Sequence, residues 1–458
     1  MEEALDEQKQ YIERIREMIA GKQMGYFIQT LGCQMNESDS EHIAGMLRDM
    51  GYIKTESVEE ASIIVFNTCC VRENAEFKLL GHIGEIKRLK EINSGLITVI
   101  CGCMMQQEHI TNKIKKSYKF IDIIFGTYNR HELPKLIYRK MTLKKRIFDI
   151  WEEQKEYVEG TPVERTSDIT AYVPIVYGCN NFCSYCIVPY VRGREISRKP
   201  QNIREEVETL ANDGIREITL LGQNVNSYES DMDFPQLLYY LSDISGIERI
   251  RFMTSHPKDL SDDLIEAVAS IPKLCKHIHL PLQSGSSKVL KEMNRHYTKE
   301  SYLALIDRIR SKIPDVTLST DIIAGFPGET EEDFAETLDV INKVAYDFAY
   351  TFIYSKRVGT PAEKREDQIS DEVKDERFGR LKNIIDAYSL SSNIKDVGRV
   401  LKVLAEGPSK TNADIMSGRT ESNKIVNFSC DPSFKGSMVD VKIIKGHTWH
   451  LEGEKYDI

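Results

Sequence analysis

The chain has 458 residues, 41% of them hydrophobic and 29% charged, which is ordinary for a globular protein with a sizeable buried core. Its net charge of −10 argues against a protein that coats nucleic acid without specificity, so an RNA partner would need a local basic patch. No apolar run approaches the ~20 residues that cross a bilayer, and the acidic N-terminus is no secretory signal, so we expect a cytoplasmic protein of about two to four domains with no membrane partner.

The N-terminal third predicts a helical extension followed by an α/β domain. In residues 1–22, Ile12, Ile15 and Ile19 recur at helical spacing, so we expect an amphipathic helix that packs on the next domain. Residues 23–145 alternate strand and helix, an order that predicts a parallel sheet with helices on its faces. The strands are expected at Gly25–Leu31, Ser62–Asn67, Ile97–Gly102 and Ile121–Phe125, and the helices at Ser38–Met50, Glu73–Leu89, Gln106–Lys116 and Asn129–Arg139.

Three cysteines stand just past three of these strands. They are Cys33, Cys69 and Cys103, and the carboxyl ends of parallel strands gather ligands at one edge of a sheet. We therefore expect the three thiols to meet at one rim. The alternative is three unrelated buried cysteines, which would have to follow successive strands by chance. Three thiolates suit an iron–sulfur cluster with one open iron better than a closed zinc site, which usually takes four protein ligands.

Residues 146–168 are rich in charge and lack periodicity, so we expect a linker there. The next expected domain spans residues 169–392. Within it, residues 169–355 repeat a strand-then-helix unit about six times, which is fewer than the eight of a closed barrel. The pattern predicts an open, partial (β/α)6 barrel whose site lies at the carboxyl ends of its strands. The strands are expected at Tyr172–Tyr177, Glu217–Leu221, Arg249–Met253, His277–Leu280, Thr317–Ile323 and Phe348–Tyr354, and helices at Arg204–Asn212, Asp262–Ala269, Glu300–Ser311, Glu331–Val344 and 370–393.

Residues 393–458 change to short alternating strands separated by turns, which predicts a small all-β barrel. The strands are expected at Val400–Leu404, Lys424–Phe428 and Met438–Ile443. Such barrels often bind RNA or single strands, but this segment has about as many acids as bases, so its charge alone does not show it.

A tight cysteine triplet follows the first strand of the partial barrel. Cys179, Cys183 and Cys186 have the spacing Cys-x3-Cys-x2-Cys, and a zinc site here would need a fourth ligand from a histidine. The motif resembles the signature of the radical SAM superfamily. That resemblance implies a four-iron cluster whose open iron binds S-adenosylmethionine, which is split to a radical able to break an unactivated C–H bond.

The dispersed motifs are similar to those of methylthiotransferases. They are Gly32 to Asn36, Asn67 to Ala75 and Gly102 to Met104, and the late stretch from Gly418 to Val426 looks like a TRAM module. With Val191 to Arg198, the first motif is most similar to the MiaB type of this family, which acts on isopentenylated adenosine in tRNA. The resemblance covers roughly residues 24–456; the N-terminal helix and a second cysteine, Cys70, depart from it.

The resemblance implies two [4Fe-4S] clusters and S-adenosylmethionine. One S-adenosylmethionine would methylate sulfur on the cluster of Cys33, Cys69 and Cys103, and a second would yield the radical that takes hydrogen from carbon 2 of the adenine. The expected partners are a tRNA anticodon stem-loop, an electron donor and a sulfur donor, with the chain a monomer. The target base would be splayed out of its loop.

Polar loops after the strands of the partial barrel are expected to bind the cofactor. Gln223 and Asn224 follow the second strand, Gln283 and Ser284 the fourth, and Gly325 the fifth, while Tyr185 lies inside the triplet. Each loop has an alternative interpretation as turn chemistry alone.

A basic run follows the triplet and is the candidate RNA contact. Arg192, Arg194, Arg198 and Lys199 are opposed only by Glu195; the alternative is a solvated basic turn. We also expect Arg419, in the TRAM-like stretch, to contact RNA. Cys101, Cys275 and Cys430, like His277 and His279, are expected to be structural.

Two rival functions remain open. One is a methylthiotransferase that acts on a ribosomal protein, which the Gln34-Met35-Asn36 motif argues against. The other is a cluster-carrying electron-transfer or RNA-binding protein, which would need no S-adenosylmethionine.

Overall fold

A computed structural model describes residues 2–70, 73–154, 157–410 and 412–457, and divides the chain into two compact units. The first unit comprises residues 1–166, 177–180 and 186–196, and the second 167–176, 181–185 and 197–458. Val71 and Arg72 of the second cysteine motif, and Lys155 of the expected linker, lie outside the described residues. No helix in the described ranges is long and apolar enough to span a membrane.

The first unit contains a six-stranded, fully parallel sheet, which confirms the expected α/β organisation. The strand order is β2-β1-β3-β4-β5-β6, so β1, β3 and β4, which the cysteines follow, are neighbours. The strands are β1 Gly25–Leu31, β2 Ile53–Lys54, β3 Ala61–Thr68, β4 Ile97–Gly102, β5 Ile123–Phe125 and β6 Ile147–Asp149.

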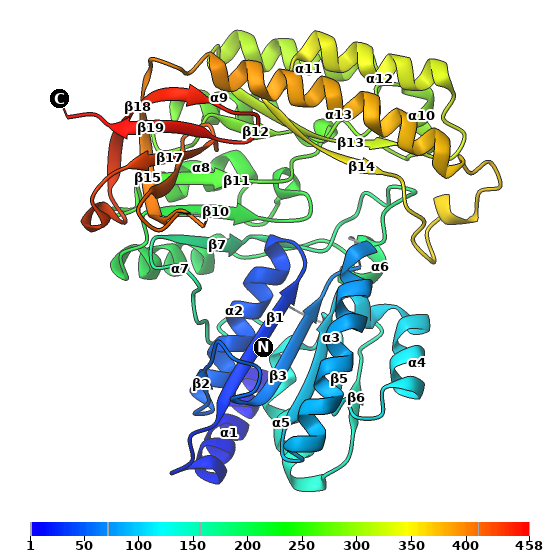
Figure 1. Ribbon diagram of the computed structural model, residues 1–458, viewed down its shortest axis with the longest axis vertical. Helices are drawn as coiled ribbons and strands as arrows, with labels where there is room; N and C mark the ends of the chain where they lie inside the picture. Colours follow the sequence, from blue (N-terminus) through cyan, green and yellow to red (C-terminus); the bar gives the residue numbers. More distant parts are fainter. Residues whose placement is uncertain (1, 71–72, 155–156, 411, 458) are drawn as a thin grey trace. The chain divides into compact units, whose positions relative to one another are not determined.

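Helices cover both faces of this sheet (Figure 1). One face packs against α1, α2 and α5 and the other against α3 and α4. Ile12, Ile15 and Ile19 of α1 are buried in the first of these cores, as their spacing predicts. The helices are α1 Glu2–Ile19, α2 Gln34–Asp49, α3 Glu73–Ile92, α4 Glu108–Ser117, α5 Leu133–Leu143 and α6 Val188–Arg192.

The segment 146–168, expected as a linker, begins by completing this sheet. Strand β6 pairs in parallel with β5. Farther along, Glu164 accepts a hydrogen bond of 2.9 Å from Tyr26, and Thr166 donates one of 2.7 Å to Glu41 of α2. Residues up to Thr166 are therefore held on the first unit by specific bonds rather than left as a free connection.

The second unit contains the expected open barrel of six parallel strands. Three strands run in the order β7-β10-β11 and three in the order β12-β13-β14, and a parallel bridge from Ile250 to Leu274 lies between the two sets. The strands are β7 Thr170–Pro174, β10 Glu217–Leu221, β11 Arg249–Phe252, β12 His277–His279, β13 Thr317–Ala324 and β14 Phe348–Ile353; two short strands, β8 Val176–Tyr177 and β9 Ile196–Ser197, flank the cysteine triplet.

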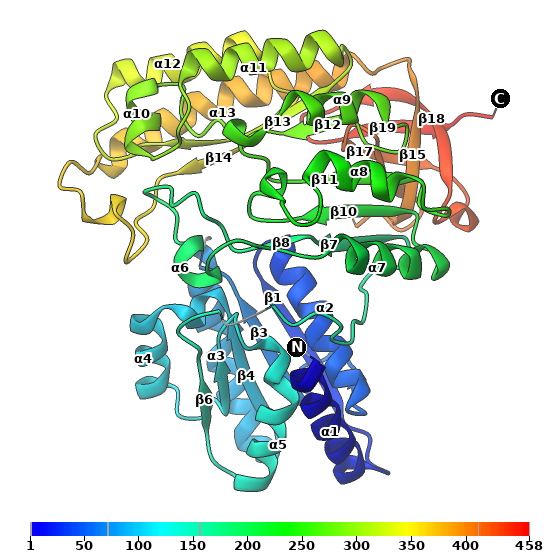
Figure 2. The same cartoon turned by 180° about the vertical axis from the view of Figure 1, so that it is seen from behind.

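Helices pack against the barrel strands through the largest apolar core of the chain (Figure 2). Helix α8 was not expected from the sequence, although Asp233 and Gln236 cap it reciprocally. It is short and starts with Phe234-Pro235, so it offers little helical periodicity to detect. The helices are α7 Pro200–Asn212, α8 Phe234–Ser242, α9 Asp262–Ser270, α10 Ser287–Glu292, α11 Lys299–Lys312, α12 Glu331–Val344 and α13 Asp371–Ile394.

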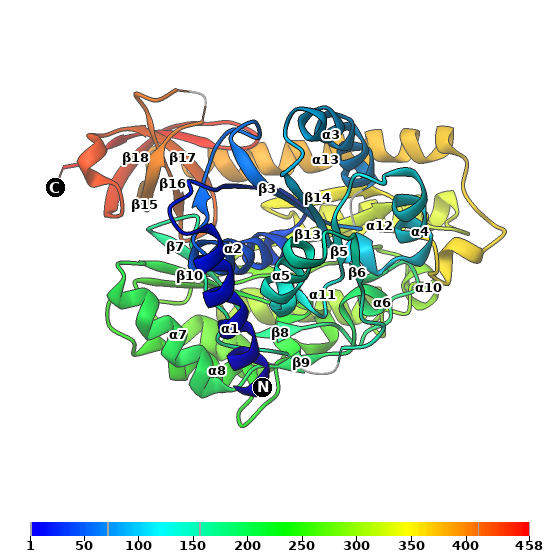
Figure 3. The same cartoon turned by 90° about the horizontal axis from the view of Figure 1, so that it is seen from below.

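The chain ends in a closed five-stranded barrel with the order β15-β16-β17-β19-β18 (Figure 3). Three of its strands were expected, whereas β16 and β19 were not, because each contains a glycine that interrupts the alternating apolar pattern. The strands are β15 Val400–Pro408, β16 Met416–Thr420, β17 Ile425–Ser429, β18 Met438–Gly446 and β19 Leu451–Lys455.

Two buried arginines on β11 join this barrel to the (β/α) strands. Arg251 is paired with Glu217 of β10 at 2.7 Å and donates to the backbone oxygens of Thr420 and Glu421. Arg249 donates to the backbone oxygens of Arg419 and Lys402 at 2.7 and 2.8 Å. The junction is therefore made by charge-assisted hydrogen bonds to main-chain groups, which fixes the turn after β16.

Replacing Arg251 by methionine should destabilise the second unit by about 3–5 kcal/mol, because Glu217 would stay buried without its main counter-charge. The measurement is denaturant unfolding followed by circular dichroism. The matched control is Arg216→Met, whose ion pair with Glu248 is long at 3.9 Å and exposed, and which should cost less than about 1 kcal/mol. Equal stability of the two variants would contradict the assignment.

Candidate functional site

The three dispersed cysteines meet at one rim of the parallel sheet, as the sequence predicts. Cys33 immediately precedes α2, Cys69 follows β3, and Cys103 follows β4 and opens a short 3-10 turn. A hydrogen bond from Cys69 lowers the pKa of the Cys33 thiol to about 5, against the opposing effect of burial. Cys103 lies close enough to Cys33 for their charges to interact. The donor set is thus three clustered thiols, two with lowered pKa, which fits an iron–sulfur cluster.

A fourth sulfur, Cys70, lies at the same rim but plays a different part. It donates a hydrogen bond to Cys103, which raises the pKa of the Cys70 thiol and lowers that of Cys103. Cys70 also packs in a small apolar cluster with Ile187 and Val191. Cys70 is therefore a fourth thiol beside Cys103, and the ligand expected from the position in the motif stays Cys69.

Two asparagines, neither of which was expected to have a role, join the cysteine loops at this rim through hydrogen bonds. The Asn36 amide donates to Asn67 Oδ1 and to the Thr68 oxygen, both at 3.1 Å. Asn67 donates back to the Asn36 oxygen at 2.8 Å. Gly102 adopts φ +95°, and a Cβ there would lie 2.4 Å from the Thr68 oxygen, so only glycine lets β4 approach β3 here. The signal was present, since both asparagines stand inside the cysteine motifs.

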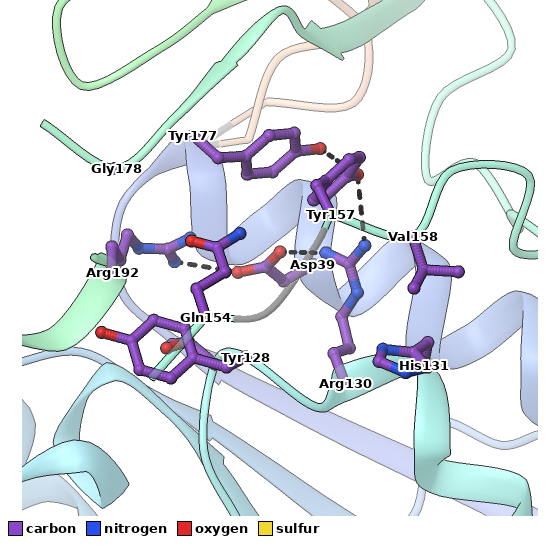
Figure 4. A pocket seen from close by; sticks show the side chains of 11 residues that line it. Asp39, Tyr128, Arg130, His131, Gln154, Tyr157, Val158, Tyr177, Gly178 and Arg192 are labelled. Atoms are coloured by element: carbon purple, nitrogen blue, oxygen red, sulfur yellow. Dashed lines mark hydrogen bonds and ion pairs between the residues drawn. The ribbon is translucent and has the colours of Figure 1, made fainter. Parts of the chain in front are cut away.

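Arg192 is buried beside the cysteines and does not form part of an exposed basic patch. Its Nε donates to Cys103 Sγ at 3.1 Å, and its Nη2 is paired with Asp39 at 2.8 Å. The second Asp39 oxygen pairs with Arg130, so one carboxylate is shared by two guanidinium groups (Figure 4). Only 6% of Arg192 is exposed. The expectation that Arg192 contacts RNA is therefore wrong, because its charge is used inside the first unit.

A small cavity of about 30 Å³ adjoins this charged group. Tyr157 and Tyr177 line it as a stacked pair with ring centres 3.7 Å apart (Figure 4). Two buried lining atoms, Arg130 Nε and Gln154 Oε1, have no hydrogen-bond partner among the described residues. The space suffices for a water molecule or a small ion.

The tight triplet is divided between the two units. Cys179 and Cys186 belong to the first unit, and Cys183 belongs to the second. In the first unit, the Cys179 amide donates to the Gly193 oxygen at 3.1 Å. In the second, Arg295 donates to Cys183 Sγ at 3.4 Å, and the Asn294 amide donates to the oxygens of Asn181 and Phe182. Cys183 therefore has a buried guanidinium beside it, as Cys103 has Arg192.

Three buried polar atoms at the carboxyl ends of β10 and β11 have no hydrogen-bond partner in the part of the chain that the structure describes. They are Asn224 Oδ1, Ser255 Oγ and His256 Nε2. Burial, with Arg295 nearby, lowers the pKa of His256 to about 2, so its ring is neutral. Unpaired buried polar atoms are costly, so the set fits a polar ligand such as S-adenosylmethionine. Ser255 and His256 were missed, although they follow the third strand.

Two other expected cofactor contacts, Ser284 and Gly325, are packed against neighbouring helices. Ser284 is fully buried, and its hydroxyl lies 3.3 Å from that of Thr337 on α12. A Cβ on Gly325 would lie 2.4 Å from Lys374 of α13, so close packing of that helix explains this glycine. Both residues pack between elements of the second unit, which does not support their expected roles.

The other expected cofactor contacts are Tyr185, Gln223 and Gln283. Tyr185 packs beside a small apolar core, and Gln223 is partly exposed. Gln283 has φ +67°, an unusual value for a residue other than glycine.

The expected basic patch does not form as a continuous surface. Arg198 is buried, paired with Glu206 at 2.7 Å and bonded to the Pro174 oxygen, so its expected RNA contact is wrong. Arg194 and Lys199 are exposed. Arg419 is partly exposed and is paired with Glu406 at 3.5 Å.

Three family models match the chain. They are the radical SAM superfamily over residues 173–341, the uncharacterized protein family UPF0004 over residues 25–126, and the TRAM domain over residues 395–456. The matches lie in the partial barrel, the parallel sheet and the closed barrel, respectively.

Several full-length relatives carry one name, tRNA-2-methylthio-N(6)-dimethylallyladenosine synthase. The relative from Alkaliphilus oremlandii is 52% identical over 456 residues, which covers 99% of this chain and 97% of that protein. The relative from Clostridium perfringens is 54% identical over 433 residues, covering 94% and 97%. The relative from Thermoanaerobacter pseudethanolicus is 51% identical and covers 100% and 98%.

Solved structures share the fold at low identity. The radical S-adenosylmethionine methyltransferase TsrM from Kitasatospora setae matches with a TM-score of 0.54 and 13% identity over 75% of each chain. The cobalamin-dependent S-adenosylmethionine radical enzyme OxsB matches with a TM-score of 0.50 and 12% identity over 81% of this chain and 57% of that one. These matches support the fold alone.

Substitution of Cys69 should remove iron, whereas substitution of Cys70 should not. Cys69→Ala should remove about four of about eight irons per anaerobically reconstituted chain, because a ligand thiolate is lost. Cys70→Ala should retain all of them, because Cys69, which follows β3 directly, is the expected ligand. Iron and sulfide analysis with Mössbauer spectroscopy measures both; the reverse result would exchange the two assignments.

Arg192→Met should weaken the same cluster, because it removes the positive charge beside Cys103 and one of the two partners of Asp39. We expect a 10- to 100-fold faster loss of that iron to a chelator, the range typical of residues that support metal ligands. Arg194→Met changes an exposed arginine two residues away and should lose iron at the wild-type rate. Equal rates of iron loss in the two variants would contradict a role for Arg192 in retaining the cluster.

Proposed function

The chain belongs to the family of tRNA-2-methylthio-N(6)-dimethylallyladenosine synthases, and we propose that it transfers a methylthio group to carbon 2 of N6-isopentenyladenosine beside the anticodon of tRNA. The observation that carries this proposal is the meeting of Cys33, Cys69 and Cys103 at one sheet rim in a chain that also holds the radical SAM triplet. Two sites of three thiolates each match a reaction that needs both a sulfur-holding and a radical-forming centre.

The cofactors are two [4Fe-4S] clusters and S-adenosylmethionine. Cys33, Cys69 and Cys103 would hold one cluster, and Cys179, Cys183 and Cys186 the other. When bound, the clusters supply a place for sulfur and the electron that cleaves S-adenosylmethionine to a radical. The chain's own residues supply charge and position around them.

Two arginines neutralise thiolate charge at the two cysteine groups. Arg192 and Arg295 are buried and donate to Cys103 and Cys183, which favours the deprotonated sulfur that binds metal. The unpaired atoms of Asn224, Ser255 and His256 supply polar partners for S-adenosylmethionine. Because His256 is neutral, its ring does not repel the positive sulfonium of that cofactor.

The substrate is tRNA, and the TRAM barrel is its proposed contact. The exposed Arg194 and Lys199, and the partly exposed Arg419, can reach phosphate oxygens, which position RNA without reading its sequence. The target adenine leaves its stack to reach the chemistry, as enzymes that modify a base require. An electron donor and a sulfur donor complete the reaction, the chain acts as a monomer, and its substrate places it in the cytoplasm.

Three alanine variants of the reconstituted enzyme test whether the two cysteine groups have the separate roles proposed for them. Cys183→Ala should abolish both 5′-deoxyadenosine release and tRNA methylthiolation, because it removes a ligand of the radical centre. Cys69→Ala should abolish methylthiolation and retain 5′-deoxyadenosine release. Cys275→Ala, at a buried thiol whose pKa burial raises to about 12, should retain both activities. Mass spectrometry of nucleosides and of the released 5′-deoxyadenosine measures the products.

The substrate is tested separately. The enzyme is incubated with S-adenosylmethionine, reductant and sulfide, together with either isopentenylated tRNA or ribosomes. Methylthio mass on the nucleoside supports the proposal, and methylthio mass on a ribosomal protein with unmodified tRNA would overturn it.

A further inference from the structure

Two histidines and a glutamate come together on the hairpin between β18 and β19, near the C-terminal end of the chain in Figure 1. His447 and His450 stand at the two ends of the turn, which closes with a 2.9 Å hydrogen bond from the His447 amide to the His450 oxygen. Glu452 lies two residues farther along β19. The site belongs wholly to the C-terminal barrel and does not involve any cysteine.

The donor atoms of the three residues all lie within 4.8 Å of one another. His447 Nε2 is 2.7 Å from Glu452 Oε1, and His450 Nε2 is 3.9 Å from the same oxygen. A tetrahedral zinc ion with ligands at 2.0–2.2 Å would separate its donors by about 3.4 Å. The present spacings bracket that value, so small side-chain rotations would bring all three atoms onto one ion.

A plain hydrogen-bonded pair of His447 and Glu452 accounts for only part of this geometry. It leaves His450 stacked on His447, with ring centres 4.4 Å apart and planes inclined by 15°. The 3.9 Å separation is too long for a hydrogen bond from His450 to the carboxylate, yet its Nε2 belongs to the same group of donor atoms.

The end of α13 anchors the turn that carries the two histidines. The Asn393 side-chain amide donates to the His447 oxygen at 2.6 Å and to the Thr448 oxygen at 3.3 Å. The two imidazoles are therefore presented from a main chain fixed at both ends, by Asn393 and by the β18–β19 pairing. A turn fixed in this way reduces the entropy lost when its side chains converge on a ligand.

We propose that His447, His450 and Glu452 form a binding site for a divalent transition-metal ion, zinc in the cell. Imidazole nitrogen and carboxylate oxygen are ligands that suit zinc, and three protein ligands leave its fourth position for water. Bound metal ties the turn to β19 and stiffens the hairpin that closes the barrel. Trp449, which lies between the two histidines in the sequence and is 58% exposed, would then be held at a fixed place on the surface.

The test uses the full chain with both clusters loaded, so that the six cysteines proposed as cluster ligands are occupied. Zn²⁺ is added, and amide hydrogen exchange is followed by mass spectrometry in the peptides that cover residues 438–455. We expect saturating Zn²⁺ to slow exchange in the hairpin by at least about tenfold. Amide exchange requires the hairpin to open, and the ion binds only while the three side chains are held together in the folded hairpin. Mg²⁺ should have no effect, since it prefers oxygen ligands.

Matched variants decide whether the ion binds these residues. His450→Ala and Glu452→Gln should each lose the protection while keeping wild-type exchange without metal, because both side chains lie at the surface. His109→Ala removes an exposed histidine on α4 and should keep it. Unchanged hairpin exchange with Zn²⁺, or protection that survives in His450→Ala, would overturn the proposal, as would protection confined to peptides outside the hairpin.

Discussion

Parallel pairing of β1, β3 and β4 is the constraint on which the first site depends. Each strand ends at the same edge of the sheet, so residues far apart in sequence arrive together once the strands are in register. Asn36 and Asn67 then lock the loops to one another through reciprocal hydrogen bonds. The parallel backbone arrangement therefore brings the three cysteines to one edge, and the hydrogen bonds of the surrounding side chains fix the positions of their loops.

Buried positive charge is the second feature that the two cysteine groups share. A guanidinium buried without a partner is expensive, so each arginine must find negative charge nearby. Arg192 finds Asp39 and Cys103, and Arg295 lies beside Cys183. The same charge that satisfies the arginine favours the thiolate, so stability of the fold and readiness to bind metal come from one interaction.

The sequence was sufficient for features that depend on local pattern. Strands β1, β4 and β10 and helix α12 have the bounds that periodicity predicted, and the cysteines occupy the expected strand ends. It was insufficient where a partner lies far along the chain. Arg192 looked like part of a basic surface, and its burial depends on Asp39, which stands 153 residues earlier. Arg198 is similar, because its carboxylate and carbonyl partners appear only when α7 packs near β7.

At the junction between the partial barrel and the TRAM barrel, Arg419 takes part through its backbone oxygen rather than through the charge of its side chain. Arg249 and Arg251 bind main-chain oxygens of residues 419–421, and Glu217 balances their charge. Main-chain acceptors are present whatever the side chains are, so this contact constrains where the turn lies rather than what it carries. The closed barrel is thereby held against strands β10 and β11, whose carboxyl ends carry the atoms of Asn224, Ser255 and His256 that have no partner among the described residues. The buried arginine pair thus links the proposed RNA-binding module to the strands that hold the proposed cofactor site, through charge-assisted bonds that a flexible linker could not supply.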